Sequence, residues 1–128
     1  MYLGNLATLT LDASAGLVAS AAGTEINLQK YFVNPGKRPM EAVVCAIWTA
    51  SDSGTATFNY KLQESNTTVD SDFSDISGAA ITQVAADVGN TFQTVPFFTA
   101  KQYIRGYHTT TAGVWTVAAA VLTSKRDG

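Results

Sequence analysis

Three aspartates within six residues are the most suggestive chemical feature of the chain. Asp70, Asp72 and Asp75 lie in the stretch LQESNTTVDSDFSDISG, residues 62–78. Carboxylates at this spacing could bind Ca²⁺ or work as an acid/base pair. An EF-hand loop needs a glycine at its sixth position, and the sixth position counted from Asp70 is Asp75. Asp and Ser also bond readily to the backbone of turns. We therefore interpret the stretch as a structural loop between two strands, anchored by Phe73.

Other residues that could do chemistry are few. His108 is the only histidine and Cys45 the only cysteine, whereas a zinc site takes three or four nitrogen, sulfur or oxygen ligands. The sequence contains no G-x-S-x-G nucleophile turn and no glycine-rich phosphate-binding motif. We therefore expect no catalytic residue, no metal and no cofactor, and the chain is not expected to be an enzyme. Cys45 is interpreted as a buried thiol that packs as a small apolar side chain.

Charge and composition exclude some partners. The formal net charge is −2, and the eight Lys and Arg residues form no cluster, so we expect no nucleic acid partner. The longest apolar run, residues 42–48, is too short to span a bilayer, so we expect no membrane partner. The N-terminus lacks the basic region of a secretory signal, which predicts synthesis in a cytoplasm. Charged residues make up only 14% of the chain, which suggests that part of the surface is covered in an assembly.

The elements that would position these residues are strands, because apolar residues recur with a period of two. Alternation is clear in TATFNYKLQE (residues 55–64), QYIRGYHTT (102–110) and GVWTVAAAVLT (113–123). The segment AVVCAIWTA (42–50) is apolar at both parities, which predicts a central strand. Pro96 cannot donate to a strand ladder, so its strand is predicted to be an edge or to carry a bulge.

Two features leave alternatives open. The segment AAITQVAADVGN, residues 79–90, has helical spacing of apolar residues, yet its surroundings favour strand plus loop. Aromatic residues on strands could form a stacking platform for sugar rings or pack in the core, and core packing is the commoner arrangement. The aromatic residues concerned are Phe58, Phe92, Tyr103, Tyr107, Trp48 and Trp115.

The number and spacing of these strands predict the fold class. About seven or eight short strands separated by turns are typical of an all-β protein, an antiparallel β-sandwich or jelly roll. At 128 residues the chain is expected to form a single domain, residues 1–128. Residues 1–6 are expected to form an N-terminal arm before the first clear strand.

The order of segments resembles the tailed-bacteriophage capsid cement (decoration) proteins of the jelly-roll type, as in the Bordetella phage cement protein family. An Ala/Ser/Thr-rich opening, LTLDASAGLVASAAGTEINL, is followed by the turn NPGKRPM and the apolar strand EAVVCAIWTA. The segment TATFNYKLQESNT then leads into the acidic loop, and the chain finishes with QYIRGYHTTTAGVWTVAAAVLTS. The sequence departs from this pattern at Gly106, where such a strand usually carries a larger residue.

This resemblance implies a mechanical function. The protein would bind the outer surface of a phage head, after synthesis in the host cytoplasm, and clamp neighbouring capsomers of the major capsid protein. It would act as a homo-oligomer, a dimer or a trimer, because several linked contacts raise avidity. A carbohydrate-binding β-sandwich module is the alternative function. The expected protein-interface residues are the apolar residues of the arm and the cations of the NPGKRPM turn, namely Tyr2, Leu3, Leu6, Lys37 and Arg38.

Overall fold

The chain folds into two layers of β-strands. The computed structural model describes residues 6–17, 21–30, 40–48, 57–85, 90–111 and 115–124. Within these residues the strands are accompanied by 3₁₀ helices at Leu28–Lys30 and Asp70–Asp72. The strands are β1 (Leu6–Leu17), β2 (Ala21–Ala22), β3 (Ile26–Asn27), β4 (Met40–Trp48), β5 (Thr57–Ser65), β6 (Ser74–Ala80), β7 (Val84–Ala85), β8 (Asn90–Phe97), β9 (Tyr103–Thr111) and β10 (Trp115–Ser124).

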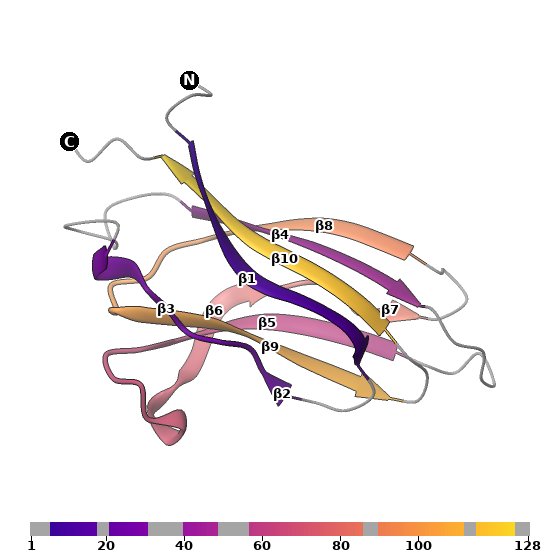
Figure 1. The fold of residues 1–128 in the computed structure, drawn as a ribbon, viewed down its shortest axis with the longest axis horizontal. Helices are drawn as coiled ribbons and strands as arrows, with labels where there is room; N and C mark the ends of the chain where they lie inside the picture. Colours follow the sequence, from indigo (N-terminus) through magenta and orange to yellow (C-terminus); the bar gives the residue numbers. More distant parts are fainter. Residues whose placement is uncertain are drawn as a thin grey trace.

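The strands form two antiparallel sheets that face each other (Figure 1). Sheet A has the order β1-β10-β4-β8, and sheet B has the order β2-β9-β5-β6. The short strand β3 extends sheet B beside β9, and β7 extends it beside β5. When β2 with β3 and β6 with β7 are each taken as one strand, the order of both sheets is that of an eight-stranded jelly roll. The predicted fold class, an antiparallel β-sandwich or jelly roll, is confirmed.

The core lies between the two sheets and is built from alternate residues of the central strands. Phe58 lies next to Tyr60 and Trp115, with ring centroids 6.2 and 5.4 Å away. All three rings are fully buried, as the core interpretation of the aromatics predicted. The other fully buried large side chains are Leu28, Leu62, Ile104, Val44, Val117 and Val121.

For three of the other aromatics, Tyr103, Tyr107 and Phe92, the core interpretation was wrong, and the Trp48 side chain lies outside the described residues. Tyr103 and Tyr107 are half-buried, and they lie on the side of β9 opposite to the buried Ile104. Phe92 is 67% exposed on β8. Because a strand presents alternate residues to opposite faces, these three rings lie on the outer faces of the sandwich.

Two strand predictions are confirmed by the topology. The doubly apolar segment forms β4, which lies between β10 and β8 inside sheet A. Pro96 lies in β8 at the edge of that sheet. An edge strand tolerates proline because one of its sides has no ladder to complete.

The open alternative at residues 79–90 is decided in favour of extended chain where the structure describes it. β6 ends at Ala80, β7 covers Val84–Ala85, and residues 86–89 lie outside the described residues. The Ile81 N–H donates to the Tyr60 carbonyl at 3.0 Å, so the segment continues along β5 as a strand neighbour would. Pairing with β5 therefore outweighs the helical spacing of the apolar residues.

The structure explains why position 106 is a glycine, although strands of this kind in the cement proteins usually carry a larger residue there. A Cβ built on Gly106 would lie 1.7 Å from Tyr60 Oη, so the tyrosine ring occupies the space that a side chain would fill. Tyr60 is itself only 1% exposed. The strand β9 therefore needs a glycine here because β5 carries a large aromatic residue facing it.

Gly78 has a different role, because its φ of +75° lies in the left-handed region. Four residues of β6 are accommodated opposite a single residue of β5 at this point. Gly78 allows the chain to bulge so that both Ile76 and Ala79 point into the core.

No helix within the described parts of the chain has the length and apolar character needed to cross a membrane.

Candidate interaction surfaces

The acidic stretch covers the outer face of sheet B through a buried arginine. Arg105 is only 7% exposed although it points away from the core. Its Nε donates to Gln63 Oε1 at 2.8 Å, and its Nη1 donates to Asp70 Oδ1 at 2.5 Å. Its guanidinium also lies over the Phe73 ring, 4.1 Å from the centroid. These contacts bind the β5–β6 connection against β5 and β9, on the side of sheet B away from sheet A (Figure 1).

The other two aspartates are also held by neighbouring side chains. Thr67 Oγ1 donates to Asp72 Oδ2 at 2.6 Å within the loop. Asp75, on β6, accepts from Gln63 Nε2 at 3.0 Å and from Lys61 Nζ at 2.9 Å. Gln63 thus joins Asp75 to Arg105. We call Gln63, Asp70, Phe73, Asp75 and Arg105 the loop clamp.

The partners of the three carboxylates explain why the stretch is structural. Asp70 and Asp75 are paired with cations, and Asp72 is held by a hydroxyl group. Among the residues that the structure describes, no group of three or more His, Cys, Asp or Glu residues could hold a metal ion. The interpretation of residues 62–78 as a strand connection anchored by Phe73 agrees with these contacts.

Asp75 makes part of the stability of the clamp depend on pH. The hydrogen bond from Gln63, and then that from Lys61, lower the pKa of Asp75 below its ordinary value of 3.8. A carboxyl group with a lowered folded pKa stabilises the fold above its unfolded pKa and loses this contribution as the pH falls through the folded pKa. We predict that Asp75→Asn lowers the free energy of unfolding at pH 7 by less than about 1 kcal/mol, because Asp75 is well exposed.

The same substitution should flatten the loss of stability below pH 3.8. Urea unfolding of both proteins between pH 2 and pH 7, followed by circular dichroism, measures this difference. Asp72→Asn is the matched control, since Asp72 has no cationic partner among the contacts described above. If Asp75→Asn and the parent lose stability in parallel below pH 3.8, the ionised form of Asp75 does not contribute.

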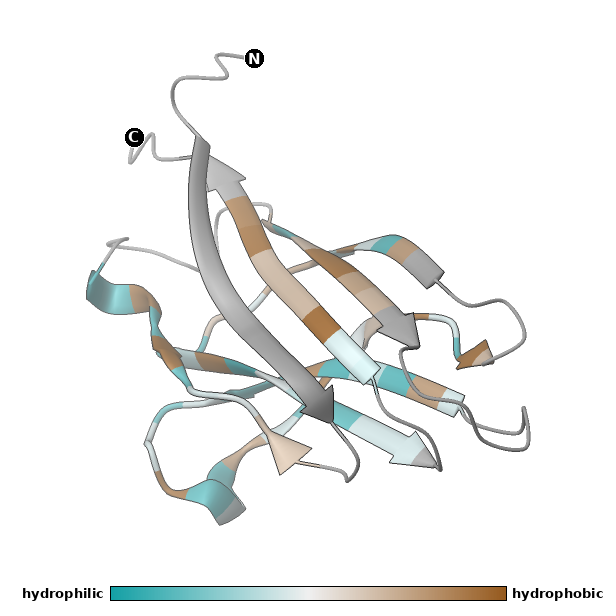
Figure 2. Cartoon of the chain, turned by 45° about the vertical axis from the view of Figure 1, so that its right-hand side comes forward, coloured by the Kyte–Doolittle hydropathy of each residue, from teal (hydrophilic) through white to brown (hydrophobic). Residues whose placement is uncertain are grey.

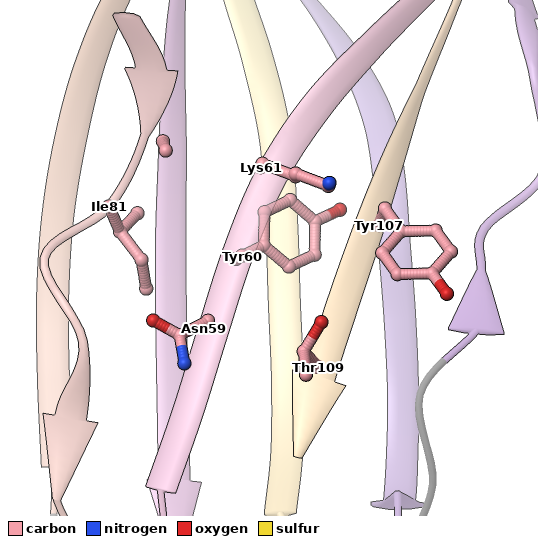
Figure 3. Close-up of a pocket in the computed structure, with 7 residues that line it drawn as sticks. Asn59, Tyr60, Lys61, Ile81, Tyr107 and Thr109 are labelled. Atoms are coloured by element: carbon pink, nitrogen blue, oxygen red, sulfur yellow. The ribbon is translucent and has the colours of Figure 1, made fainter. Parts of the chain in front are cut away.

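A cavity of about 290 Å³ lies beside the clamp on sheet B, and residues of β5, β9 and the β6–β7 segment line it. In Figure 3, Asn59 and Lys61 of β5 lie on one side and Tyr107 and Thr109 of β9 on the other. Lys61 Nζ is 5.4 Å from the Tyr107 ring centroid and is also bonded to Asp75. An aromatic ring flanked by an amide, a hydroxyl and an ammonium group could bind a polyhydroxylated ring.

The outer face of sheet A has a different chemistry. We call its described outward-facing side chains the sheet A face. It contains one charged residue, Glu41, at the start of β4. The sheet A face consists of Glu41, Val43 and Cys45 from β4, Phe92, Thr94 and Pro96 from β8, and Thr116, Ala118, Ala120 and Leu122 from β10.

Cys45 belongs to this face, and its thiol is half-buried rather than fully buried as predicted. Its neighbours Val44 and Ala46 are fully buried. Because β4 is apolar at both parities, its sequence did not distinguish the core side from the outer side. Opposite Cys45 lie Ala118 on β10 and Phe92 on β8.

The two outer faces of the sandwich are therefore unlike. Figure 2 shows mostly brown and pale colours along β10 and β4, whereas teal segments recur along β5 and β9. Sheet B carries Lys61, Arg105 and Asp75 in a bonded network. A contiguous surface of small apolar and hydroxyl side chains rimmed by a single charge is typical of a protein interaction site.

Only one of the predicted interface residues lies in the part of the chain that the structure describes. Leu6 is the first residue of β1 and pairs with Ser124 of β10. The other predicted interface residues, Tyr2, Leu3, Lys37 and Arg38, lie outside the described residues.

The sheet A face was missed by sequence reasoning, although its signal was present. Uncharged residues at both parities of residues 42–48 and of residues 117–122 predict strands without a polar side. Such strands are usually covered on both sides, and no described segment of the chain covers their outer side.

Comparison with solved structures places the chain among β-sandwich proteins. No protein-family model and no curated protein sequence matches the chain. The SPBc2 prophage-derived protein YomS is 15% identical, with a TM-score of 0.54 over 93% of this chain and 93% of that chain. Latent PorU from Porphyromonas gingivalis is 11% identical, with a TM-score of 0.54 over 93% of this chain.

The chain spans only 12% of PorU. A capsid chain of Israeli acute paralysis virus also matches, at 13% identity and a TM-score of 0.46, over 89% of this chain and 67% of that chain. At these identities the similarity shows only a shared fold. The similarity to the virus chain, with a TM-score below 0.5, is too weak to support an inference. The class that fold and surfaces define is a jelly-roll β-sandwich with one apolar outer face.

Proposed function

We propose that the chain is a structural decoration (cement) protein of a bacteriophage virion, which binds the outer surface of the head and clamps neighbouring capsomers of the major capsid protein. The observation that carries this proposal is the contrast between the two outer faces of the sandwich. One face is apolar and is covered by none of the described segments, and the other is closed by a bonded polar network. A clamp built from linked copies needs a surface of the first kind for the contact between copies, and a rigid framework behind it.

Two further observations support a virion protein. The eight-stranded jelly roll is a frequent fold of viral capsid domains. The prophage-derived protein YomS has a similar fold over almost the whole of both chains. The proposed place of work, outside the shell after synthesis in the host cytoplasm, agrees with a net charge of −2, since a surface that contacted packaged DNA would carry clustered cations.

The contacts with the capsid are proposed to come from the N-terminal arm and the NPGKRPM turn. Tyr2, Leu3 and Leu6 would supply apolar contacts, and Lys37 and Arg38 would pair with acidic capsid groups. Each contact can be modest, because linking two or more of them in one oligomer raises the overall avidity. No catalytic group is needed for this function.

Binding to capsid shells tests the proposal. Shells assembled from the major capsid protein of the same genome, free of this chain, are titrated with purified protein and sedimented. We predict saturable binding at a fixed ratio to capsid subunits. The double substitution Lys37→Ala with Arg38→Ala should weaken binding about tenfold, because exposed ion pairs contribute up to about 1 kcal/mol each.

Lys101→Ala is the matched control, because Lys101 is exposed on the connection between β8 and β9 and should not change binding. Raising the salt concentration should weaken the parent more than the double variant. Protein that remains in the supernatant at every concentration, with folded shells in the pellet, would overturn the decoration proposal.

A carbohydrate-binding module is the second candidate, and the cavity beside Tyr107 favours it. The jelly roll is also a fold of lectin domains. The shell experiment separates the two functions. Binding that is abolished by free oligosaccharide and by Tyr107→Ala, but is unchanged by neutralising Lys37 and Arg38, would assign the contact to the cavity and favour the carbohydrate-binding function.

A further inference from the structure

We propose that the sheet A face is the surface by which two copies of the chain pair, face to face, about a two-fold axis that runs along β4. The inference rests on the proposed function for its biological purpose, since a clamp needs linked copies. A two-fold contact of this kind gives a dimer rather than a trimer, the two oligomers expected from the sequence. It also assigns the self-contact to residues that are separate from those proposed to bind the capsid.

The size of the face is that of a small specific contact. Three strands about 4.8 Å apart and about eight residues long cover roughly 380 Å² in projection. Protruding side chains such as Phe92, which is 67% exposed, add accessible surface to this projection. The face therefore falls in the range of the smaller interfaces, which bury less than about 600 Å² per partner and suit a monomer–dimer equilibrium.

The charge of the face favours a second copy over a charged partner. Glu41 is the only ionisable carboxylate or cation among its described side chains, and it lies at one end, opposite Pro96 and Leu122. A face without cations offers nothing to an acidic partner, and a single rim carboxylate offers little to a basic one. A second copy of the same face offers a matching apolar surface, and its only unfavourable charge contact is a weak repulsion between the two described Glu41 side chains at the rim.

The distribution of side-chain size makes the face complementary to itself. β8, at the edge, carries the large Phe92, whereas β10 carries the small residues Ala118 and Ala120. A two-fold axis along β4 places β8 of one copy over β10 of the other. Each phenylalanine ring would then rest on the alanines of the opposite copy, as sheets packed about 10 Å apart require.

The ladder between these strands is regular. β4 pairs with β10 and with β8 without a register shift, whereas β1 pairs with β10 with two shifts. A regular three-stranded surface can approach another closely, because no bulge projects from it.

Pairing through the free edge of β8 is the competing arrangement, and the edge itself disfavours it. Pro96 has no N–H to donate. The Gln93 side chain accepts from Thr82 N–H and donates to Thr82 O, both at 2.9 Å, so the β6–β7 segment is bonded beside this edge. An edge that carries a proline and is partly covered resists strand addition. The face, rather than the edge, is therefore the available surface.

Sedimentation equilibrium of the isolated protein tests the inference without any capsid. We expect a monomer–dimer equilibrium for the parent chain. Ala118→Arg should weaken the dimer at least about 100-fold, because it buries an unpaired cation from each copy. Thr109→Arg is the matched control, since it adds the same charge at an exposed position on sheet B and should leave the dimer unchanged.

Glu41→Gln distinguishes a second copy from a basic partner. With the axis along β4 the two Glu41 side chains lie near each other at the rim, so the substitution should tighten the dimer about fivefold. Raising the salt concentration should tighten the parent dimer and leave the Glu41→Gln dimer nearly unchanged. A basic partner surface would give the opposite effects.

The single cysteine provides a second readout that does not depend on the size of the particle. Cys45 lies at the centre of the face, so its rate of alkylation by iodoacetamide should fall as the protein concentration rises and the dimer forms. Ala118→Arg should abolish this dependence on concentration while leaving the circular dichroism spectrum unchanged.

Two results would overturn the inference. The first is a parent chain that is monomeric at several hundred micromolar. The second is a dimer that Ala118→Arg leaves intact. Neither result bears on shell binding by the arm and the turn, which the sedimentation of shells tests separately. Failure of the dimer can therefore be distinguished from failure of the decoration proposal.

Discussion

Replacing Arg105 with alanine is expected to lower the free energy of unfolding by about 3 kcal/mol. The substitution leaves Gln63 Oε1 buried without its donor, which costs about 1–3 kcal/mol. It also removes the guanidinium from the Phe73 ring, a contact worth about 0.5–2 kcal/mol. Urea unfolding followed by tryptophan fluorescence measures the difference, since Trp115 is fully buried in the folded chain.

Asp70→Asn is the control for the ion pair alone. The Asp70 side chain is 87% exposed, and the amide oxygen of asparagine can still accept from Arg105. We expect a loss below about 1 kcal/mol. If Asp70→Asn lowers the free energy of unfolding as much as Arg105→Ala does, the ion pair accounts for most of the stabilisation by Arg105. That result would contradict the role given to Gln63 and Phe73.

The pair Arg105→Leu with Gln63→Leu tests the same point from the other side. Replacing both members of a buried polar pair with apolar residues removes the unsatisfied acceptor, so the double variant should be more stable than Arg105→Ala. If it is less stable, packing of the long arginine side chain outweighs the hydrogen bond.

Replacing Gly106 with alanine is expected to be similarly damaging, with a loss of about 3 kcal/mol, at the upper end of the range for overpacking. The new Cβ would lie 1.7 Å from Tyr60 Oη and 2.3 Å from Tyr60 Cζ. The tyrosine ring cannot turn away freely, because it lies beside Phe58 in the closed core. Thermal and urea unfolding of the variant measure the loss.

Gly78→Ala separates overpacking from backbone strain. A Cβ at Gly78 would meet no atom within 4 Å, but its φ is +75°. The cost should therefore be only the left-handed backbone penalty, about 1–2 kcal/mol. If Gly78→Ala costs more than Gly106→Ala, overpacking against Tyr60 is not the dominant effect at Gly106.

A double-mutant cycle tests the contact with Tyr60 directly. Tyr60→Leu alone should destabilise the chain through lost core volume. Combined with Gly106→Ala it should cost less than the sum of the two single losses, because leucine leaves room for the new methyl group. Additive losses would show that the two positions are independent.

The loop clamp and the Tyr60–Gly106 contact lie on opposite faces of sheet B, and both join β5 to β9. Sheet B is thereby fixed on its core side by packing and on its outer side by polar contacts. A decoration protein that resists outward force on a shell would need such stiffness in the layer that does not make the self-contact. We therefore propose that sheet B provides rigidity and that sheet A provides the contact between two copies.

Much of the fold could be predicted from the sequence, because strand alternation is a local property. The alternation at residues 55–64 correctly assigned Phe58 and Leu62 to the core. Pro96 predicted an edge strand or a bulge, because a missing N–H has the same consequence in any sheet, and the edge is what the structure has. These inferences need only neighbouring residues.

The candidate surfaces could not be predicted in the same way, because they depend on residues that are distant in the chain. Arg105 and Asp70 are 35 positions apart and meet only because β5, β6 and β9 are neighbours in sheet B. Cys45, Phe92 and Ala118 form one row only because β8 and β10 flank β4.

By itself the sequence determined that this chain is built of strands and which residues within most strands share a side, because side-chain alternation acts locally. It also determined that the strand with Pro96 lies at an edge or bulges, because proline has no N–H to donate. The tertiary structure alone decided which side of β4 meets the core, why residue 106 is a glycine, and that one outer face is apolar while the other is closed by a buried arginine. Those features arise from strand order, and strand order is set by the packing of the whole sandwich rather than by any single segment.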